Sequence, residues 1–309
     1  MLTTPPDDRD LIRSQNRGSR TYAIGGQSYP SVTSIISQGE AKPALINWAK
    51  KVTAEAAVAQ HELVKTLIDT DGPQAAIDHL KGAAYRQRNA AGDLGSRLHE
   101  VAEYEVLEGK EYPDPGDPEA RELLNHFRHF LAEVQPEFVA VEAVVVNQDY
   151  GYAGTLDACA TIPMLRELGP VLLDWKSGSG VYGSYGMQLA AYANAESVVG
   201  PNGLESWEGV TNTEVAYVVH ITPRGWRLVE MHIGEETFDA FLSCMQMAEW
   251  ASFQDSVVGQ VVAKGRATGG KALHRKEDTS TPEEAVVAPV TVGNFGNRRK
   301  IQPPTLKSS

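Results

Sequence analysis

The sequence predicts an α/β fold, in which a central mixed β-sheet is flanked by helices, with a helical N-terminal portion and a flexible C-terminal tail. Helical periodicity dominates up to about residue 135, and valine-rich segments with strand alternation follow it. After about residue 254 the chain turns to Gly, Pro, Ser, Thr and charged residues, a composition typical of segments without a packed core. Helices, then strands interrupted by one helix, then a final helix indicate a single α/β domain.

The N-terminal portion is expected to be mostly helical. Residues 1–19 are polar, and we expect a disordered leader there. The segment 22–29 carries a Gly-Gly pair between alternating residues, which predicts a small hairpin, and Ser31 offers a hydroxyl at the start of a helix. Further helices are predicted over 43–64, 73–87, 92–107 and 118–134.

The strand-rich portion begins at 137–147, where valines alternate. We expect Val139, Val141, Ala143 and Val145 to share one face of this strand and Glu142 to lie on the other. Strands are also predicted over 152–162, 170–176, 213–221 and 225–233, and helices over 184–198 and 235–253. The predicted organisation is therefore a leader (1–19), one domain (20–254, helical over 43–135, with the candidate chemistry in 92–254) and a tail (255–309).

The charge of the chain is uneven. The formal net charge is −12, which at first argues against a nucleic-acid partner. From residue 255 onward there are nine Lys/Arg and five Asp/Glu, so the tail carries +4 and residues 1–254 carry −16. We expect that the basic tail either contacts nucleic-acid phosphates or is simply a solvated segment.

Cysteine content and hydropathy restrict the expected cofactors and location of the protein. The two cysteines, Cys159 and Cys244, cannot make a disulfide framework or a four-cysteine metal site, so no iron–sulfur cluster is expected. No run of about 18 apolar residues occurs, so no membrane span or membrane partner is expected. The N-terminus lacks the pattern of a secretory signal, and the expected location is the cytoplasm.

Two acids and a lysine carry the strongest chemical signal. Asp174 and Lys176 end an apolar strand and should point to one face of it, while Asp157 lies on the preceding strand. Two carboxylates that converge across adjacent strands suit Mg²⁺ or Mn²⁺, and a lysine beside them can stabilise charge on a phosphate. The alternative is an ordinary salt bridge between Asp174 and Lys176 at a strand end.

Two helical pairs add candidates. His99 and Glu103 are four residues apart and share a helix face, so the imidazole could be a third metal ligand. Gln188 and Tyr192 have the same spacing, and an amide and a hydroxyl can contact phosphate or brace the lysine. The alternatives are a surface histidine, and a helix that packs on the sheet with two polar edges.

Taken in order, these elements resemble the PD-(D/E)XK nuclease superfamily, and within it the RecB-like exonucleases and the related nucleases of CRISPR adaptation. The resemblance spans about 100 residues and rests on four elements: Gly95…His99…Glu103, Gly154-Thr155-Leu156-Asp157, Leu173-Asp174-Trp175-Lys176-Ser177-Gly178 and Gln188…Tyr192. The segments Tyr29-Pro30-Ser31-Val32-Thr33 and Lys42-Pro43-Ala44-Leu45…Trp48 are similar to the leaders of actinobacteriophage exonucleases of this group.

The resemblance implies a restriction-endonuclease-like core and a role for each matching residue. His99, Asp157 and Asp174 would ligate the metal, and Lys176 would be the catalytic lysine. Gln188 and Tyr192 would lie near the scissile phosphate, Glu103 would support the site, and Glu142 would be an extra acid. Many relatives carry four cysteines for an iron–sulfur cluster, which this chain lacks.

The function implied is hydrolysis of DNA by a Mg²⁺-dependent (or Mn²⁺-dependent) exonuclease in a bacterial host, in phage recombination or DNA processing. Linear duplex or single-stranded DNA would be the substrate, with a second copy of the chain or a phage recombination protein as further partner. Lys176 would stabilise charge on the phosphate or help deprotonate the attacking water. Two alternatives remain: a non-catalytic DNA-binding protein of the same fold, and a restriction-type endonuclease.

Overall fold

The computed structural model describes residue 3 and residues 13–16 and 19–262. The chain divides into two units, Met1–Ala251 and Ser252–Ser309, and the first contains the elements discussed below. In the second, the described residues form the short helix η2 (Gln254–Val257) and an irregular stretch up to Val262. The expectations for the tail beyond that point lie outside the described residues.

The elements of the first unit follow the order that the sequence predicts, with three extra strands, β1, β7 and β8. The helices are α2 (Val32–Gly39), α3 (Pro43–Ala59), α4 (His61–Asp71), α5 (Pro73–Lys81), α6 (Ala83–Leu107), α7 (Pro118–Val134), η1 (Pro163–Leu168), α8 (Gly183–Ala193) and α9 (Glu235–Phe253). The strands are β1 (Arg13–Asn16), β2 (Ser19–Ile24), β3 (Gln27–Pro30), β4 (Glu137–Asn147), β5 (Tyr152–Thr161), β6 (Val171–Lys176), β7 (Ser197–Gly200), β8 (Gly203–Ser206), β9 (Val215–Thr222) and β10 (Gly225–His232).

A mixed seven-stranded sheet forms the centre, in the order β10-β9-β6-β5-β4-β7-β8. β6 and β9 are parallel, because α8 and the segment after it connect them, and the other neighbours are antiparallel. The expected α/β fold with a central mixed sheet is therefore confirmed. A separate three-stranded sheet, β1-β2-β3, includes the predicted hairpin, whose turn residues Gly25 and Gly26 have φ of 58° and 79°.

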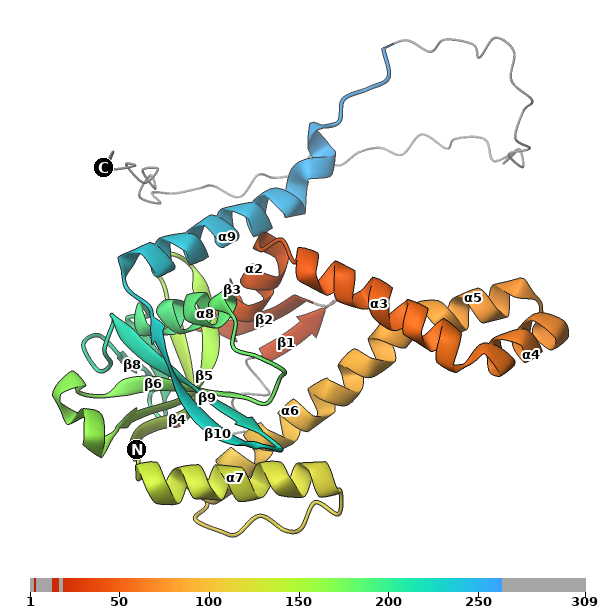
Figure 1. Ribbon diagram of the computed structural model, residues 1–309. Coiled ribbons are helices and arrows are strands. Elements are labelled where there is room, and N and C mark those ends of the chain that lie inside the picture. Colours follow the sequence, from red (N-terminus) through yellow and green to blue (C-terminus); the bar gives the residue numbers. More distant parts are fainter. Residues whose placement is uncertain (1–2, 4–12, 17–18, 263–309) are drawn as a thin grey trace, which may run out of the picture. The chain divides into compact units, whose positions relative to one another are not determined.

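Helices cover both faces of the central sheet (Figure 1). One face packs against α2, α8 and α9, with Ile35, Leu189 and Phe241 in its core. The other face has two separate covers: α6 and α7 contact one part of it, with Phe127 in that core, and the small sheet contacts the β4–β5 part through Tyr22. The second face therefore changes its packing partner partway along β4 and β5.

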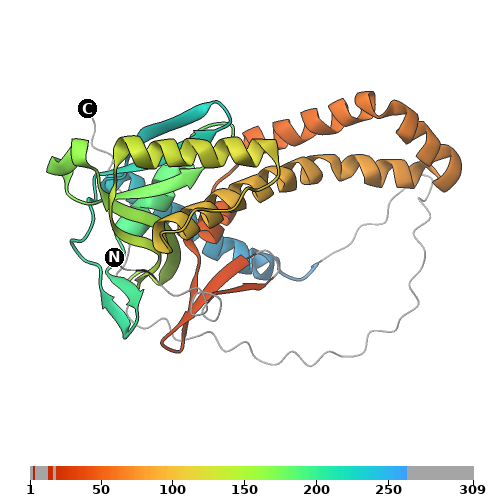
Figure 2. The ribbon, with the colours of Figure 1, turned by 90° about the horizontal axis from the view of Figure 1, so that it is seen from below.

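A group of helices, α3 to α6, leads away from the sheet and returns to it. Within the group α3 packs on α6 and α4 on α5, and both views show the helices running outward from the sheet (Figures 1 and 2). The C-terminal half of α6 contacts the sheet, where Leu98, Val101 and Ala102 are buried. This half carries His99, so the packing of α6 decides where that imidazole lies.

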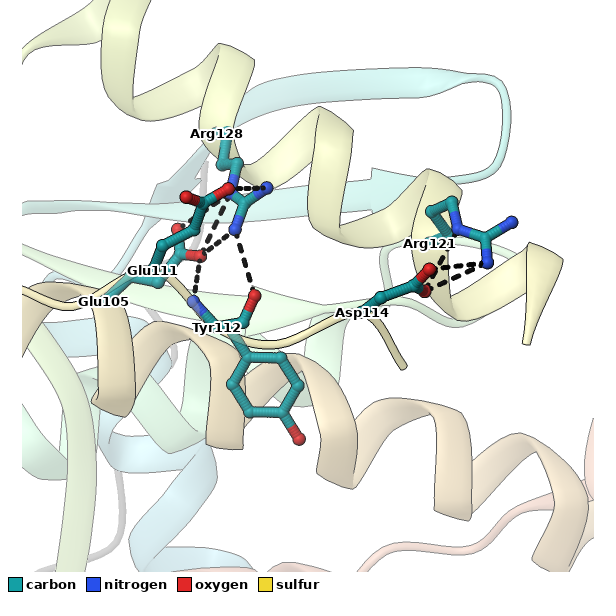
Figure 3. Close-up of polar contacts among 6 residues, drawn as sticks. All are labelled: Glu105, Glu111, Tyr112, Asp114, Arg121 and Arg128. Atoms are coloured by element: carbon teal, nitrogen blue, oxygen red, sulfur yellow. Dashed lines mark hydrogen bonds and ion pairs between the residues drawn. The ribbon is translucent and has the colours of Figure 1, made fainter. Parts of the chain in front are cut away.

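An arginine on α7 ties α6 to α7 and to the loop between them (Figure 3). Arg128 Nη2 donates to Glu105 Oε1 on α6 at 2.6 Å and to the Tyr112 carbonyl at 3.2 Å. The same Glu105 oxygen accepts from the backbone N–H of Tyr112 at 2.9 Å. Hydrogen bonding to Glu105 raises the pKa of Arg128, opposed by burial. The second pair in Figure 3, Arg121 with Asp114, is exposed.

We expect Arg128→Met to lower the free energy of unfolding by about 1–2 kcal/mol, because it leaves the nearly buried Glu105 carboxylate without its charged partner. The matched variant Arg121→Met should change stability much less, since its ion pair is exposed to solvent. Urea unfolding of both proteins measures the difference. Equal effects would contradict the role given to Arg128.

Several boundaries differ from the prediction. The helices predicted over 73–87 and 92–107 are divided at Gly82 instead, into α5 and α6. Arg13–Asn16 forms a strand on β2 within the segment predicted to be a disordered leader. The helix predicted over 43–64 is broken at Gln60 into α3 and α4. The helix predicted over 184–198 ends at Ala193, because Asn194 is held outside it by Asn147 Nδ2, which donates to the Asn194 carbonyl at 2.7 Å. Val198 then pairs with β4, so an available strand edge outweighs helix propensity there.

No helix in the described ranges is long and apolar enough to cross a membrane.

Candidate active site

The candidate site lies where two central strands separate. β5 and β6 pair from Ala160↔Val171 to Ala158↔Leu173, and the next positions in this register are Asp157 and Asp174. There the ladder stops, and Asp157 Oδ2 instead accepts a hydrogen bond from the backbone N–H of Trp175 at 2.8 Å. The side chain of Asp157 thus bridges the gap between the strands. The predicted convergence of two acids across adjacent strands is what the structure contains.

Glu142 is brought to the same place by an irregularity in β4. It lies opposite Asp157, between the pairs Val141↔Ala158 and Ala143↔Leu156, and its φ of 49° is left-handed, which is uncommon for a residue other than glycine. The alternation reverses across it: Val141 packs toward α6 and α7, whereas Ala143 packs toward α8. The expectation that Val139, Val141, Ala143 and Val145 share a face is therefore wrong, because this residue and a bulge after Phe138 break the period of two.

His99 on α6 completes a cluster with these two acids. Its Nδ1 lies 3.5 Å from Asp157 Oδ1 and 3.8 Å from Glu142 Oε1. One ligand atom from each of the three residues lies within 4.8 Å of the other two, so the three could hold a metal ion together. Both carboxylates are largely shielded from solvent. We call His99, Glu142 and Asp157 the carboxylate–histidine cluster.

Asp174 and Lys176 form a second group beside the cluster. Lys176 Nζ lies 2.5 Å from Asp174 Oδ2, and Gln188 Nε2 on α8 donates to Asp174 Oδ1 at 3.0 Å. Both charged side chains point to the α8 face, as strand alternation predicts. The ammonium also lies 5.0 Å from the centre of the Tyr185 ring, a contact that the sequence interpretation missed although Tyr185 is one turn before Gln188.

Burial and charge set the protonation of these groups. Burial raises the pKa of Asp174, although the Lys176 ammonium lowers it. Burial lowers the pKa of Lys176, but Asp174 and Asp157 outweigh it, so the net shift is upward. Lys176 is therefore charged at neutral pH. This favours the role of stabilising negative charge over that of a base, which would need a depressed pKa.

In the carboxylate–histidine cluster two carboxylates flank one imidazole. Burial lowers the pKa of His99, yet Asp157 and Glu142 together raise it to about 9. Two carboxylates and one imidazole within reach of one another form a donor set that suits Mn²⁺, and Mg²⁺ if water fills the remaining positions. The residues present therefore fit a divalent cation.

Two further predicted site residues, Tyr192 and Glu103, lie on the helices α8 and α6. Tyr192 is 3% exposed and belongs to the core of the α8 face, with its ring against Gly154. Burial raises the pKa of its hydroxyl well above the usual range. Glu103 lies one turn beyond His99 on α6 and is half-buried. The structure gathers His99, Glu142, Asp157, Asp174, Lys176 and Gln188. Tyr192 is buried nearby, and Asp157 and Asp174 contribute to its raised pKa.

Packing explains why a glycine, Gly154, lies three residues before Asp157. A Cβ atom at Gly154 would lie 2.4 Å from Tyr192 Cε1, which no real contact allows. We expect Gly154→Ala to lower the free energy of unfolding by about 1–3 kcal/mol, because the buried ring must shift. The control Gly151→Ala has free space around the new methyl but a left-handed φ of 76°. Adding Tyr192→Leu should restore stability to Gly154→Ala and not to Gly151→Ala. Failure to rescue would contradict the packing reason.

No model of a known protein family matches the chain, and no curated protein is similar to it. The functional interpretation therefore rests on the residues and geometry described above.

Proposed function

We propose that the protein is a metal-dependent nuclease that hydrolyses DNA phosphodiester bonds at the carboxylate–histidine cluster. The proposal rests on two groups that lie together where β5 and β6 separate. One group is three potential metal ligands, and the other is a charged lysine held by a buried carboxylate. Hydrolysis of a phosphodiester needs positive charge at the phosphate and an activated water, and this pair of groups can supply both.

His99, Glu142 and Asp157 would hold the cation, with Asp174 at its edge. When bound, a divalent cation polarises phosphoryl oxygens and lowers the pKa of a water molecule. Lys176 places an ammonium toward the same space and stabilises negative charge that develops on the phosphate. Gln188 fixes the Asp174 carboxylate, and Asp174 in turn fixes the position of Lys176 Nζ.

A surface salt bridge, the alternative for Asp174 and Lys176, is disfavoured by burial. Asp174 is 1% exposed, and isolated ion pairs at that depth contribute little to stability relative to apolar side chains. Charged pairs that lie beside further ionisable groups are typical of functional sites. The pair of Asp174 and Lys176 is therefore better explained by a catalytic role than by a contribution to stability.

Linear and closed-circular DNA distinguish the modes of cleavage. We propose exonuclease action, so the purified protein with Mg²⁺ or Mn²⁺ should degrade linear duplex from its ends and leave a closed circle intact. EDTA should stop the reaction, and excess metal should restore it. Cleavage of the closed circle would assign an endonuclease, and metal-dependent binding without cleavage of either substrate would indicate the non-catalytic alternative.

A further inference from the structure

A second positively charged feature lies at the edge of the sheet near Lys176. A cleft of about 850 Å³ is lined by the loop after β6 and by the β9–β10 hairpin. Its polar lining includes Ser177, Ser179, His220, Arg224, Arg227 and Glu119. Neither arginine of the cleft makes an ion pair with another residue in the described part of the chain, and both are exposed.

The arginine of the last strand is held in place by a buried histidine. His220 is 2% exposed, and its Nε2 lies 2.6 Å from the Gly178 carbonyl. A ring nitrogen facing a carbonyl must donate, so Nδ1 accepts from Arg227 Nη2 at 2.7 Å. His220 thus fixes both the loop after Lys176 and the guanidinium of Arg227. Such an arrangement reduces the entropy that an arginine loses on binding an anion.

The strand register connects this cleft to the candidate active site. Lys176 pairs with His220 across β6 and β9, and His220 pairs with Arg227 across β9 and β10. Paired residues in neighbouring strands point to the same face, so the three side chains form one row. Adjacent strands are about 4.8 Å apart, which places the backbone of Arg227 about 10 Å from that of Lys176. The row runs from the catalytic position to the sheet edge.

The two arginines of the cleft are unusual in a protein this acidic. Residues 1–254 carry a net charge of −16, yet two guanidinium groups without an acidic partner meet in one cleft. Only Glu119, at the start of α7, brings a negative charge to the lining. Arginine forks and serine hydroxyls are the groups that proteins use to hold phosphate oxygens.

We propose that this cleft binds a backbone phosphate of the DNA strand that is cleaved, through Arg224 and Arg227. The inference rests on the proposed nuclease function and adds a substrate-binding site to it. His220 is a positioning residue, because it acts through Arg227. A phosphate held there would fix the strand relative to Lys176 and select the bond that reaches the cluster.

The test measures binding to a short linear duplex in the full-length Asp174→Asn background with Mn²⁺, where cleavage is not expected. Adding Arg227→Gln or Arg224→Gln should weaken binding roughly ten-fold and lower the salt slope by about 1 each. The control is Arg166→Gln. Arg166 is exposed, precedes the N-terminal end of β6 and pairs with Glu137, so its loss should leave affinity unchanged.

Single neutral methylphosphonate linkages then locate the phosphate. One position should weaken binding by the Asp174→Asn protein and have no effect once Arg227 is replaced. Affinities of Arg224→Gln and Arg227→Gln equal to that of Arg166→Gln would overturn the proposal. Cleavage by the wild-type protein is measured separately. Binding that depends on the arginines, without cleavage, would contradict only the proposed nuclease function. Cleavage, with binding that does not depend on the arginines, would contradict only the proposed phosphate site in the cleft. Absence of both activities would overturn both.

Discussion

Lys176→Met is expected to lower the rate of DNA cleavage roughly 10²–10³-fold, the effect typical of removing a preorganised group that stabilises transition-state charge. The physical reason is that the ammonium, held 2.5 Å from Asp174 Oδ2, is charged at neutral pH. Single-turnover cleavage of linear duplex at saturating Mn²⁺ measures the chemical step. A rate within a few-fold of wild type would remove Lys176 from the catalytic residues.

Loss of folding must be separated from loss of chemistry in that experiment. Lys176→Met leaves the buried Asp174 carboxylate without its cation, which can destabilise the protein by about 3–5 kcal/mol. The double variant Asp174→Asn/Lys176→Met removes both charges together, so it should recover stability while it stays inactive. A stable and active double variant would contradict the assignment of both residues.

Asp157→Asn is expected to abolish cleavage and to weaken Mn²⁺ binding at least about 10–100-fold, since even the outer partners of metal ligands have effects of that size. The amide keeps an oxygen for the Trp175 N–H, so the bridge between β5 and β6 can persist. Only the charge that faces His99 is lost. Titration calorimetry with Mn²⁺ measures the affinity, and thermal unfolding reports whether the fold is kept.

The matched control for that variant is Asp149→Asn. Asp149 is exposed in the turn between β4 and β5, away from the strand divergence, and the same chemical change there should alter neither Mn²⁺ affinity nor cleavage. Equal losses in the two variants would point to a general charge effect of this acidic protein. Unchanged Mn²⁺ affinity in Asp157→Asn would exclude Asp157 from the metal ligands.

Local patterns were enough to predict most of the sheet and half of the site. Alternation along an apolar strand places Asp174 and Lys176 on one face, and this was confirmed by their ion pair. The helical spacing from Gln188 placed an amide near them, and Gln188 donates to Asp174. These residues are predictable because each relation depends on the geometry of one strand or helix.

Relations that depend on departures from regular structure could not be predicted. Glu142 reaches His99 only because its left-handed φ reverses the face of β4, and no period in the sequence signals that. The predicted helix extends over the first two residues of β7, because the pairing of β7 with β4 is a long-range contact that local patterns do not signal. The row from Lys176 to Arg227 depends on the register of three strands, and register is set by packing across the whole sheet.

Tyr192 illustrates a different limit. The spacing from Gln188 placed it correctly on α8, yet spacing alone does not distinguish a residue at the surface of a site from one beneath it. Here Gly154 leaves room for the ring, so the tyrosine is buried and supports β5. Burial raises the pKa of its hydroxyl, which nevertheless lies close enough to Asp157 and Asp174 for both carboxylates to raise that pKa further.

Anomalous diffraction from crystals grown with Mn²⁺ tests the assignment of the site most directly. A single strong peak is expected between His99 Nδ1 and the carboxylates of Glu142 and Asp157, next to Asp174, and it should disappear in Asp157→Asn. A peak elsewhere in the molecule, or none at saturating Mn²⁺, would contradict the proposal that this cluster is the metal centre of a nuclease.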